Sequence, residues 1–364
     1  MESVWHDGLT RCQQAFFLLL RYGLWEQPPG DVSPFPLTAD EWMQVYLESQ
    51  RQAVQGLLFR GFQQLPEHLF PPQTLVMRWL ADTTAAERSY RQSVEATATT
   101  WKLFSKAGLN PLLLKGLAVG QLYERPEERV YGDVDWRIAD MAAAEALLSR
   151  QGIKAEHRAD KSITFTCHGT EVELHPQLID LQNPNHSYAL GLLEHDDETS
   201  TMTIAEGAVV NTPTPLQTLV LLQTHILKHV VTSGIGMRQF CDLARAYHTL
   251  HRRIEDNLLV EYYCRLGLLR WTQLTHTFLH RYLGLPTEDL PCMPDAPPPD
   301  CQRLARAILR WGNFGLHATA WPTGFYHNHT KLRTATLIAR NLPFALRYAP
   351  AETAHKIKNL IVHQ

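Results

Sequence analysis

The chain has few cysteines, no long apolar run near its start and no excess of positive charge. Its six cysteines among 364 residues include no Cys-x-x-Cys pair, which excludes a zinc ribbon and is typical of reduced thiols in a cytoplasm. The first seven residues lack a basic leader, and the apolar run Ala15–Leu20 is too short for a signal segment or a membrane span. We therefore expect a cytoplasmic protein without a membrane partner.

The charge balance excludes another class of protein. A formal charge of −3 does not provide the clustered basic surface that extended nucleic-acid binding needs. The composition, 45% hydrophobic and 20% charged, is that of an ordinary soluble globular protein. A chain of this length is expected to form two or three domains.

Hydrophobic periodicity divides the chain into three parts. Residues 1–108 are expected to be helical, with a capping box from Thr38 to Glu41 and one long helix over Gln73–Lys106. Residues 109–205 alternate strand and helix, including a helix capped by Asp140, and predict a small mixed sheet. Residues 206–364 return to helical spacing in segments 215–232, 237–250, 257–284, 300–312 and 331–362. The expected fold is α+β and mostly helical: a small mixed-sheet core flanked by N- and C-terminal helical regions.

Asp133 and Asp135 lie one residue apart in Val130–Ile138, a segment typical of a strand. Side chains alternate along a strand, so both carboxylates face one side, while Val134 and Trp136 face the other and can pack in a core. Two such carboxylates repel each other without a cation, and Mg²⁺ prefers oxygen ligands together with substrate phosphates. The pair predicts a magnesium site; in metal-free buffer, asparagine at either position is expected to raise the melting temperature. The alternative is a solvated edge strand that carries two acids.

A short apolar strand upstream, Asn110–Gly116, ends in Lys115 and Gly116 and is followed by a helix-compatible run, Leu117–Tyr123. A strand, a glycine and a helix N-terminus present backbone N–H groups that suit phosphate. Lys115 adds a positive charge at the same place. We therefore expect Lys115 and Gly116 to bind the phosphates of a nucleotide.

Residues 162–175 predict a β-hairpin with a two-residue turn at His168-Gly169. Three polar residues of its second arm share one face: Glu171, Glu173 and His175. A third carboxylate can therefore reach the site opened by the aspartate pair, and His175 is a candidate for proton transfer.

These motifs together resemble the uncharacterised bacterial nucleotidyltransferases of the polymerase-β-like superfamily. The resemblance is carried by Lys115-Gly116, Arg129, Gly132-Asp133-Val134-Asp135 and Val172-Glu173-Leu174-His175. It covers roughly residues 105–180 and more loosely the helical region to about residue 250. The chain departs from the superfamily pattern in its Lys-Gly turn, in a longer spacing from Gly116 to Asp133 and in a glutamate as the third acid.

The resemblance implies a nucleoside triphosphate such as ATP as substrate and two Mg²⁺ ions as cofactor. It implies that Asp133, Asp135 and Glu173 are the catalytic and metal-binding residues. Nucleotide contacts are expected from a further set: Lys115, Gly116, Arg129, Gly132, His225 and His229.

Two members of that set have alternatives that stay open. Arg129 is expected to contact the triphosphate bidentately or to form a surface salt bridge with Glu127 or Glu128. His225 and His229 share a helix face at i and i+4, which is metal-ligand spacing, but Ile226 stands where a metalloprotease motif has glutamate. They therefore bind metal, line the cleft with Arg238 and Asp242, or serve as structural histidines.

The expected function is Mg²⁺-dependent transfer of a nucleoside monophosphate from a triphosphate to an unidentified hydroxyl or amine acceptor, a small molecule or a protein, with release of pyrophosphate. The alternative is a non-catalytic nucleotide-binding or regulatory protein on the same scaffold.

Overall fold

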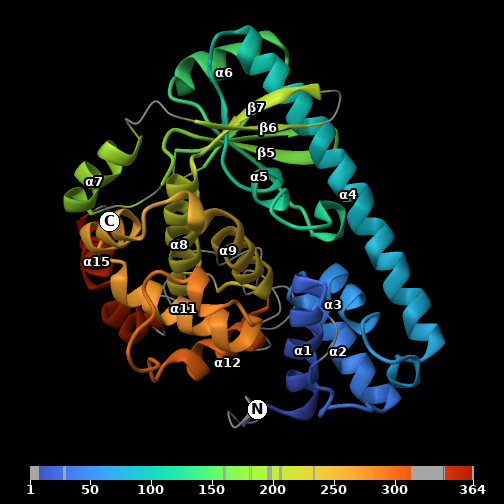
Figure 1. The fold of residues 1–364 in the computed structure, drawn as a ribbon. Helices are drawn as coiled ribbons and strands as arrows, with labels where there is room; N and C mark the ends of the chain where they lie inside the picture. The colour runs from blue at the N-terminus through green and yellow to red at the C-terminus, as the bar shows by residue number, and fades with distance from the viewer. Residues whose placement is uncertain are drawn as a thin grey trace. The chain divides into compact units, whose positions relative to one another are not determined.

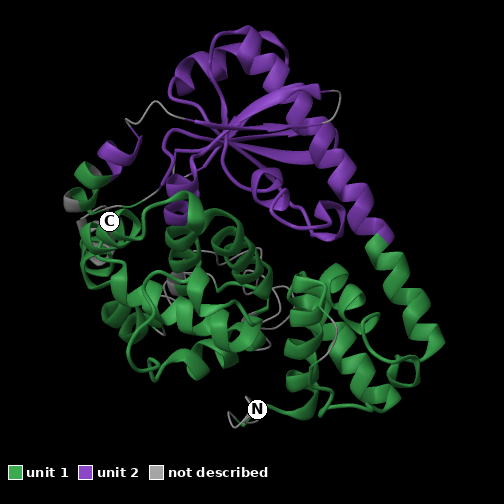
Figure 2. Cartoon of the chain, viewed as in Figure 1, with its two compact units in different colours: residues 1–83, 181–189, 222–364 green, residues 84–180, 190–221 purple. Residues whose placement is uncertain are grey.

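A computed structural model describes residues 8–27, 30–158, 161–179, 181, 183–194, 199–204, 207–232, 234–312, 339 and 341–362. The helices and strands of the chain are labelled in Figure 1. The chain divides into two compact units, which Figure 2 shows in different colours. The sheet unit comprises residues 84–180 and 190–221, and the helical unit comprises residues 1–83, 181–189 and 222–364. The fold is α+β and mostly helical, as the sequence predicts.

The strands of the described residues form one seven-stranded mixed sheet in the order β3-β4-β5-β2-β1-β7-β6. Their bounds are β1 Leu112–Leu113, β2 Val134–Arg137, β3 Glu156–His157, β4 Ile163–Cys167, β5 Thr170–His175, β6 Ser200–Thr203 and β7 Val209–Thr212. Strand β2 runs parallel to β5 and antiparallel to β1, and β1 runs parallel to β7. The candidate strand of the two aspartates is therefore central in the sheet and not an edge strand.

One face of the sheet is buried against α4 (Gln73–Lys106) and α6 (Met141–Arg150), which share a hydrophobic core with it. Val134 and Trp136 point into this core, and the Trp136 indole Nε1 donates to Thr100 Oγ1 of α4 at 2.9 Å. Because side chains alternate along β2, burying these two apolar residues directs Asp133, Asp135 and Arg137 to the opposite face. The core thus orients the carboxylates.

The β4–β5 hairpin is confirmed together with its turn. Cys167 pairs with Thr170, so His168 and Gly169 form a two-residue connection. Both have positive φ, 49° and 76°, as a type I′ turn requires. A turn of this length fixes the register of β4 against β5, in which Thr164 lies opposite Glu173.

The helical unit is built from several amphipathic helices. Besides α4 and α6, the structure gives bounds for these α-helices among the described residues: α1 Arg11–Trp25, α2 Ala39–Arg51, α3 Gln55–Phe62, α5 Leu117–Gly120, α7 Pro184–Glu194, α8 Pro215–Thr232, α9 Met237–Leu250, α10 Asp256–Arg265, α11 Leu269–Leu283, α12 Cys301–Trp311 and α15 Pro350–Val362. Of these, α5 and parts of α7 and α8 belong to the sheet unit. The Thr38 capping box, the long helix α4 and the Asp140 cap are confirmed. The segment expected at 257–284 is two helices, and that at 331–362 lies partly outside the described residues.

The division into units differs from the expected boundaries near residues 108 and 205. Residues 84–106 of α4 belong with the sheet because their apolar face forms part of its core. Part of α8 likewise belongs with the sheet unit. Among the described residues, no helix has the length and apolar character needed to cross a membrane.

Candidate active site

The register between β2 and β5 brings two acids together. Asp135 is the direct partner of Glu173 on the neighbouring parallel strand, so both side chains leave the sheet on the same face. Both are buried, with exposed fractions of 2% for Asp135 and 8% for Glu173. Two buried carboxylates in adjacent register positions need compensating charge or hydrogen bonds.

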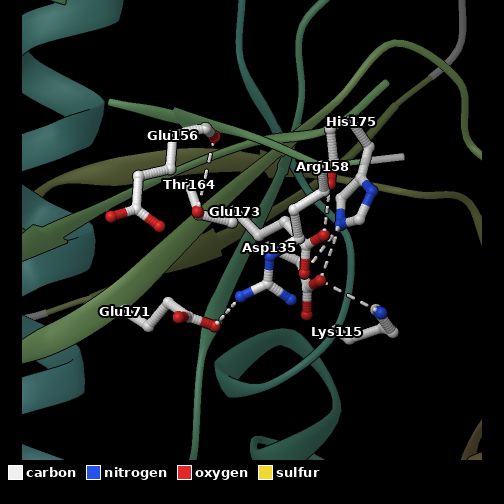
Figure 3. A network of polar contacts seen from close by, with 9 residues as sticks. Lys115, Asp135, Glu156, Arg158, Thr164, Glu171, Glu173 and His175 are labelled. Atoms are coloured by element: carbon white, nitrogen blue, oxygen red, sulfur yellow. Dashed lines mark hydrogen bonds and ion pairs between the residues drawn. The ribbon is translucent and has the colours of Figure 1, made fainter. Parts of the chain in front are cut away.

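His175 completes a group of three possible metal ligands. One ligand atom each from Asp135, Glu173 and His175 lies within 4.8 Å of the others, and Figure 3 shows the three side chains converging. His175 Nε2 is 2.9 Å from Asp135 Oδ1 and 3.8 Å from Glu173 Oε2. The Ser162 hydroxyl donates to Glu173 Oε1 at 2.6 Å, which orients that carboxylate.

Lys115 supplies the positive charge at this site. Its Nζ lies 3.0 Å from Asp135 Oδ1 (Figure 3). Burial alone lowers the pKa of Lys115, but Asp135, Asp133 and Glu173 outweigh it and raise that pKa. For the carboxyl group of Asp135, burial has the opposite effect and raises the pKa. Lys115 and the hydrogen bond from His175 outweigh burial and hold the pKa of Asp135 well below its usual range. The pair is therefore fully ionised near neutral pH.

This ion pair changes the stability expected on removing Asp135. Repulsion between Asp133 and Asp135 suggests that asparagine at either position stabilises the metal-free protein. Asp135 instead pairs with Lys115 and His175. Asparagine at position 135 therefore leaves Lys115, whose side chain is only 18% exposed, without this carboxylate. Breaking a buried pair on one side is destabilising, and the expectation is reversed for Asp135.

Asp133 and Glu171 occupy different positions from the central acids. Asp133 directly precedes β2, is half-buried, and contributes to the charge around Lys115. It is not a member of the three-ligand group found among the described residues. Glu171 is exposed and accepts from Arg158 Nη2 at 2.8 Å. Of the two glutamates that share a face on β5, Glu173 is the one beside Asp135.

Gly116 forms the turn between β1 and α5. Its backbone angles are φ 56° and ψ −110°, a region that is essentially restricted to glycine. A Cβ atom at this position would also lie 3.2 Å from the carbonyl oxygen of Asp133. Helix α5 is a single turn of four residues, shorter than the run expected over 117–123, and it adds little dipole to the site.

Gly116→Ala is expected to lower the free energy of unfolding by about 2 kcal/mol, because the strained backbone favours glycine and the new methyl group crowds Asp133. Urea unfolding followed by circular dichroism measures the change. Gly132→Ala is the matched control, since a Cβ there meets no atom within 4 Å. Equal loss in both variants would contradict a special role for the Gly116 conformation.

Arg129 lies inside the loop that precedes β2. Its side chain is only 6% exposed, its guanidinium lies 4.8 Å from the centre of the Tyr131 ring, and it donates to the Val130 carbonyl at 3.2 Å. Tyr131 in turn donates to the Pro126 carbonyl at 2.8 Å. These contacts stabilise the loop before the Asp133–Asp135 strand, and a contact of Arg129 with triphosphate stays a prediction.

His225 and His229 lie on the part of α8 that belongs to the helical unit. Their ring centres are 4.5 Å apart at an interplanar angle of 68°, an edge contact. They are not members of the ligand group described above. Their part in binding nucleotide or acceptor stays a prediction, as does that of Arg238 and Asp242.

Two residues of the site face escaped the sequence analysis. Ser162 begins the hairpin and bonds Glu173, but a serine before a strand gives no signal of such a contact. Arg137 follows Asp135 by two positions on β2 and therefore shares its face. The same alternation that paired the aspartates could have identified it.

Comparison with known proteins identifies the family of the chain. The profile of a family described as uncharacterised nucleotidyltransferase matches residues 38–284, more than half of the chain. No curated protein matches. The crystal structure of an antigenic nucleotidyltransferase-like protein from Paracoccidioides brasiliensis shares 17% identity, with a TM-score of 0.32, over 44% of this chain and 77% of that chain; a similarity this low supports no conclusion on fold or activity. From the family match, the chain belongs to the uncharacterised nucleotidyltransferase family.

Proposed function

We propose that this protein is a metal-dependent nucleotidyltransferase that moves a nucleoside monophosphate from a triphosphate, such as ATP, to a hydroxyl or amine of an acceptor and releases pyrophosphate. The observation that carries the proposal is the pairing of Asp135 with Glu173 in adjacent strand register, both buried and both on one face. A cytoplasmic location and a bacterial origin are part of the same proposal.

The donor set at the site suits a divalent cation. Asp135 and Glu173 offer carboxylate oxygens, which suit Mg²⁺ and Mn²⁺, and the His175 imidazole adds a nitrogen of the kind that binds transition metals. Two ions, as the sequence analysis expects, with Asp133 as a further ligand, would neutralise charge on the transferred phosphate and on the leaving pyrophosphate.

The residues around the metal ligands would position the reactants. Ser162 fixes the Glu173 carboxylate, so that its other oxygen can orient the acceptor hydroxyl or accept its proton. Lys115, beside the Gly116 turn, provides a largely buried ammonium for the triphosphate. Such transfer depends mainly on position and charge, because the protein forms no bond to the phosphate.

A second candidate, a nucleotide-binding protein without catalysis, is favoured by one observation. Lys115 Nζ lies 3.0 Å from Asp135 Oδ1, so a protein cation already neutralises the central carboxylate. A scaffold of this kind binds a triphosphate through Lys115 without a metal ion. The two candidates differ in whether binding depends on metal and whether pyrophosphate is released.

A triphosphate is expected to raise the melting temperature much more with Mg²⁺ or Mn²⁺ than without, since the cation screens phosphate from the site carboxylates. A ligand at a hundred times its dissociation constant stabilises by about 2.7 kcal/mol, which is readily measured. Lys115→Ala is expected to remove most of this shift. Lys154→Ala, at an exposed lysine of the same unit, serves as the matched control and should keep it.

Pyrophosphate release then separates the candidates. Release with a hydroxyl or amine acceptor supports the transferase. Binding that needs no metal, with no pyrophosphate across a broad acceptor panel, supports the binding protein. If no triphosphate stabilises the protein under any condition, both candidates are wrong.

A further inference from the structure

Arg137 is the last residue of β2 and lies on the same face as Asp135. It is the register partner of His175 on β5 and of Leu112 on β1. Leu112 in turn pairs with Asn211 on β7. At one level of the sheet, the site face therefore presents a row of four residues: His175, Arg137, Leu112 and Asn211.

The Arg137 side chain has no partner within the described part of the chain. It is half-buried, and its Nε atom is shielded from solvent without a hydrogen bond. Arg158, near the same face, differs because it pairs with Glu171 at 2.8 Å. A shielded guanidinium nitrogen without an acceptor costs free energy, which a bound anion would recover.

The direction of the strands places Arg137 at one end of the site. Because β1 and β2 are antiparallel, Lys115 and Gly116, which follow β1, lie at the Asp133 end of β2; a Cβ on Gly116 would be 3.2 Å from Asp133 O. Arg137 lies at the other end, about 7 Å along the strand from Asp135 at roughly 3.3 Å per residue. Asp135 is thus between two cationic groups.

In-line displacement assigns opposite sides to the leaving group and the attacking group. Lys115 is proposed above to bind the triphosphate; if the pyrophosphate part lies toward Lys115 and Gly116 and leaves on that side, the acceptor approaches from the side of Arg137 and His175. A planar guanidinium at that position binds a carboxylate or phosphate through two parallel hydrogen bonds. The row around it adds an amide from Asn211 and an apolar contact from Leu112.

We infer that the acceptor carries an anionic oxyacid group, a carboxylate or a phosphate, and that Arg137 binds this group. The inference rests on the proposed function. It narrows the acceptor from any hydroxyl or amine to one that also bears such a group.

The test uses the full chain saturated with Mg²⁺ and the non-hydrolysable analogue α,β-methylene-ATP. Affinities are measured by calorimetry at constant ionic strength for three compounds that all carry hydroxyl groups. Glycerol is uncharged, glycerate carries a carboxylate, and glycerol 3-phosphate carries a phosphate. We expect at least one charged compound to bind tenfold or more tightly than glycerol. The compound that does so distinguishes carboxylate from phosphate.

Arg137→Gln is expected to remove this tenfold preference and to leave the affinity for the analogue unchanged. Arg137→Lys, which retains the charge but not the planar fork, should restore part of it. Arg158→Gln is the matched control and should behave as the unmodified protein, because Arg158 already pairs with Glu171.

Two results would overturn the inference. One is that the unmodified protein binds all three compounds alike. The other is that Arg137→Gln weakens binding of the ATP analogue fivefold or more while the charged compound still binds more tightly than glycerol. This result would mean that Arg137 binds the nucleotide and not the acceptor. Failure of the analogue to bind the unmodified protein is a separate result, since it removes the proposed function itself and with it the basis for this acceptor.

Discussion

Asp135→Asn is expected to reduce the rate of nucleotidyl transfer by about a thousandfold, because removing one preorganised group that stabilises charge at a reacting centre costs a rate factor of this order. Asp135 is the register partner of Glu173, and its Oδ1 is within 3.0 Å of both Lys115 Nζ and His175 Nε2. Asparagine keeps the size of the side chain but removes the charge that would hold a metal ion. Glu173→Gln should have an effect of similar size.

The matched control for this experiment is Glu171→Gln. Glu171 is on the same strand and face as Glu173 but is exposed and paired with Arg158. It is expected to retain activity within about twofold, as exposed ion pairs contribute little. The measurement is pyrophosphate release from each ribonucleoside triphosphate, with water and a panel of hydroxyl and amine acceptors. Full turnover by Asp135→Asn, or an equal loss in Glu171→Gln, would show that the centre lies elsewhere.

Much of the local structure follows from the sequence because its signals are local. A capping box needs only Thr38 and Glu41, and both reciprocal hydrogen bonds form. A two-residue turn at His168-Gly169 needs only two positions that tolerate positive φ. Alternation along a strand relates Asp133 to Asp135, and Glu171 to Glu173, without knowledge of any other segment.

The pairing of β2 with β5 is not a local property. Some 38 positions separate Asp135 from Glu173, which lie opposite each other, and a helix and two other strands lie between β2 and β5 in the chain. The register that sets Trp136 beside Leu174 in the core places Glu173, and not Glu171, beside Asp135. The family resemblance suggested Glu173, whereas spacing alone could not choose between it and Glu171.

The balance of charge at the site also depends on contacts distant in sequence. The aspartate pair in the sequence suggests a repulsion that a metal ion relieves. In the structure, Lys115, which follows β1, already neutralises the charge of Asp135. Arg129 is similar: its position before Asp133 suggests an exposed cation, yet it is buried against Tyr131. Burial and partner choice are results of tertiary packing, which periodicity does not encode.

The Lys115–Asp135 pair gives a stability prediction that does not depend on activity. At pH 7 without metal, Asp135→Asn is expected to lower the free energy of unfolding by about 3 kcal/mol, since it leaves a largely buried ammonium without its carboxylate. Lys115→Met should have a comparable effect, because it leaves the buried carboxylate with His175 alone. Asp133→Asn, at a half-buried position just before the strand, is the control and should change stability by less than about 1 kcal/mol.

The double variant Lys115→Met/Asp135→Asn is then expected to be more stable than the sum of the two single losses predicts, with a coupling of about 2 kcal/mol. Removing both partners leaves no uncompensated buried charge, and a methionine fills much of the lysine volume. Urea unfolding of the unmodified protein, the two single variants and the double variant measures this coupling.

The coupling should also depend on pH. The pKa of Asp135 in the folded protein lies below its value in the unfolded chain, so the stabilisation by its carboxylate is fully present above about pH 5 and is lost as the pH falls through and below about 3.9. The coupling should therefore decline in acid. If the stability losses of the two single variants simply add in the double variant at pH 7, the ion pair does not stabilise this site, and other contacts hold Lys115 there.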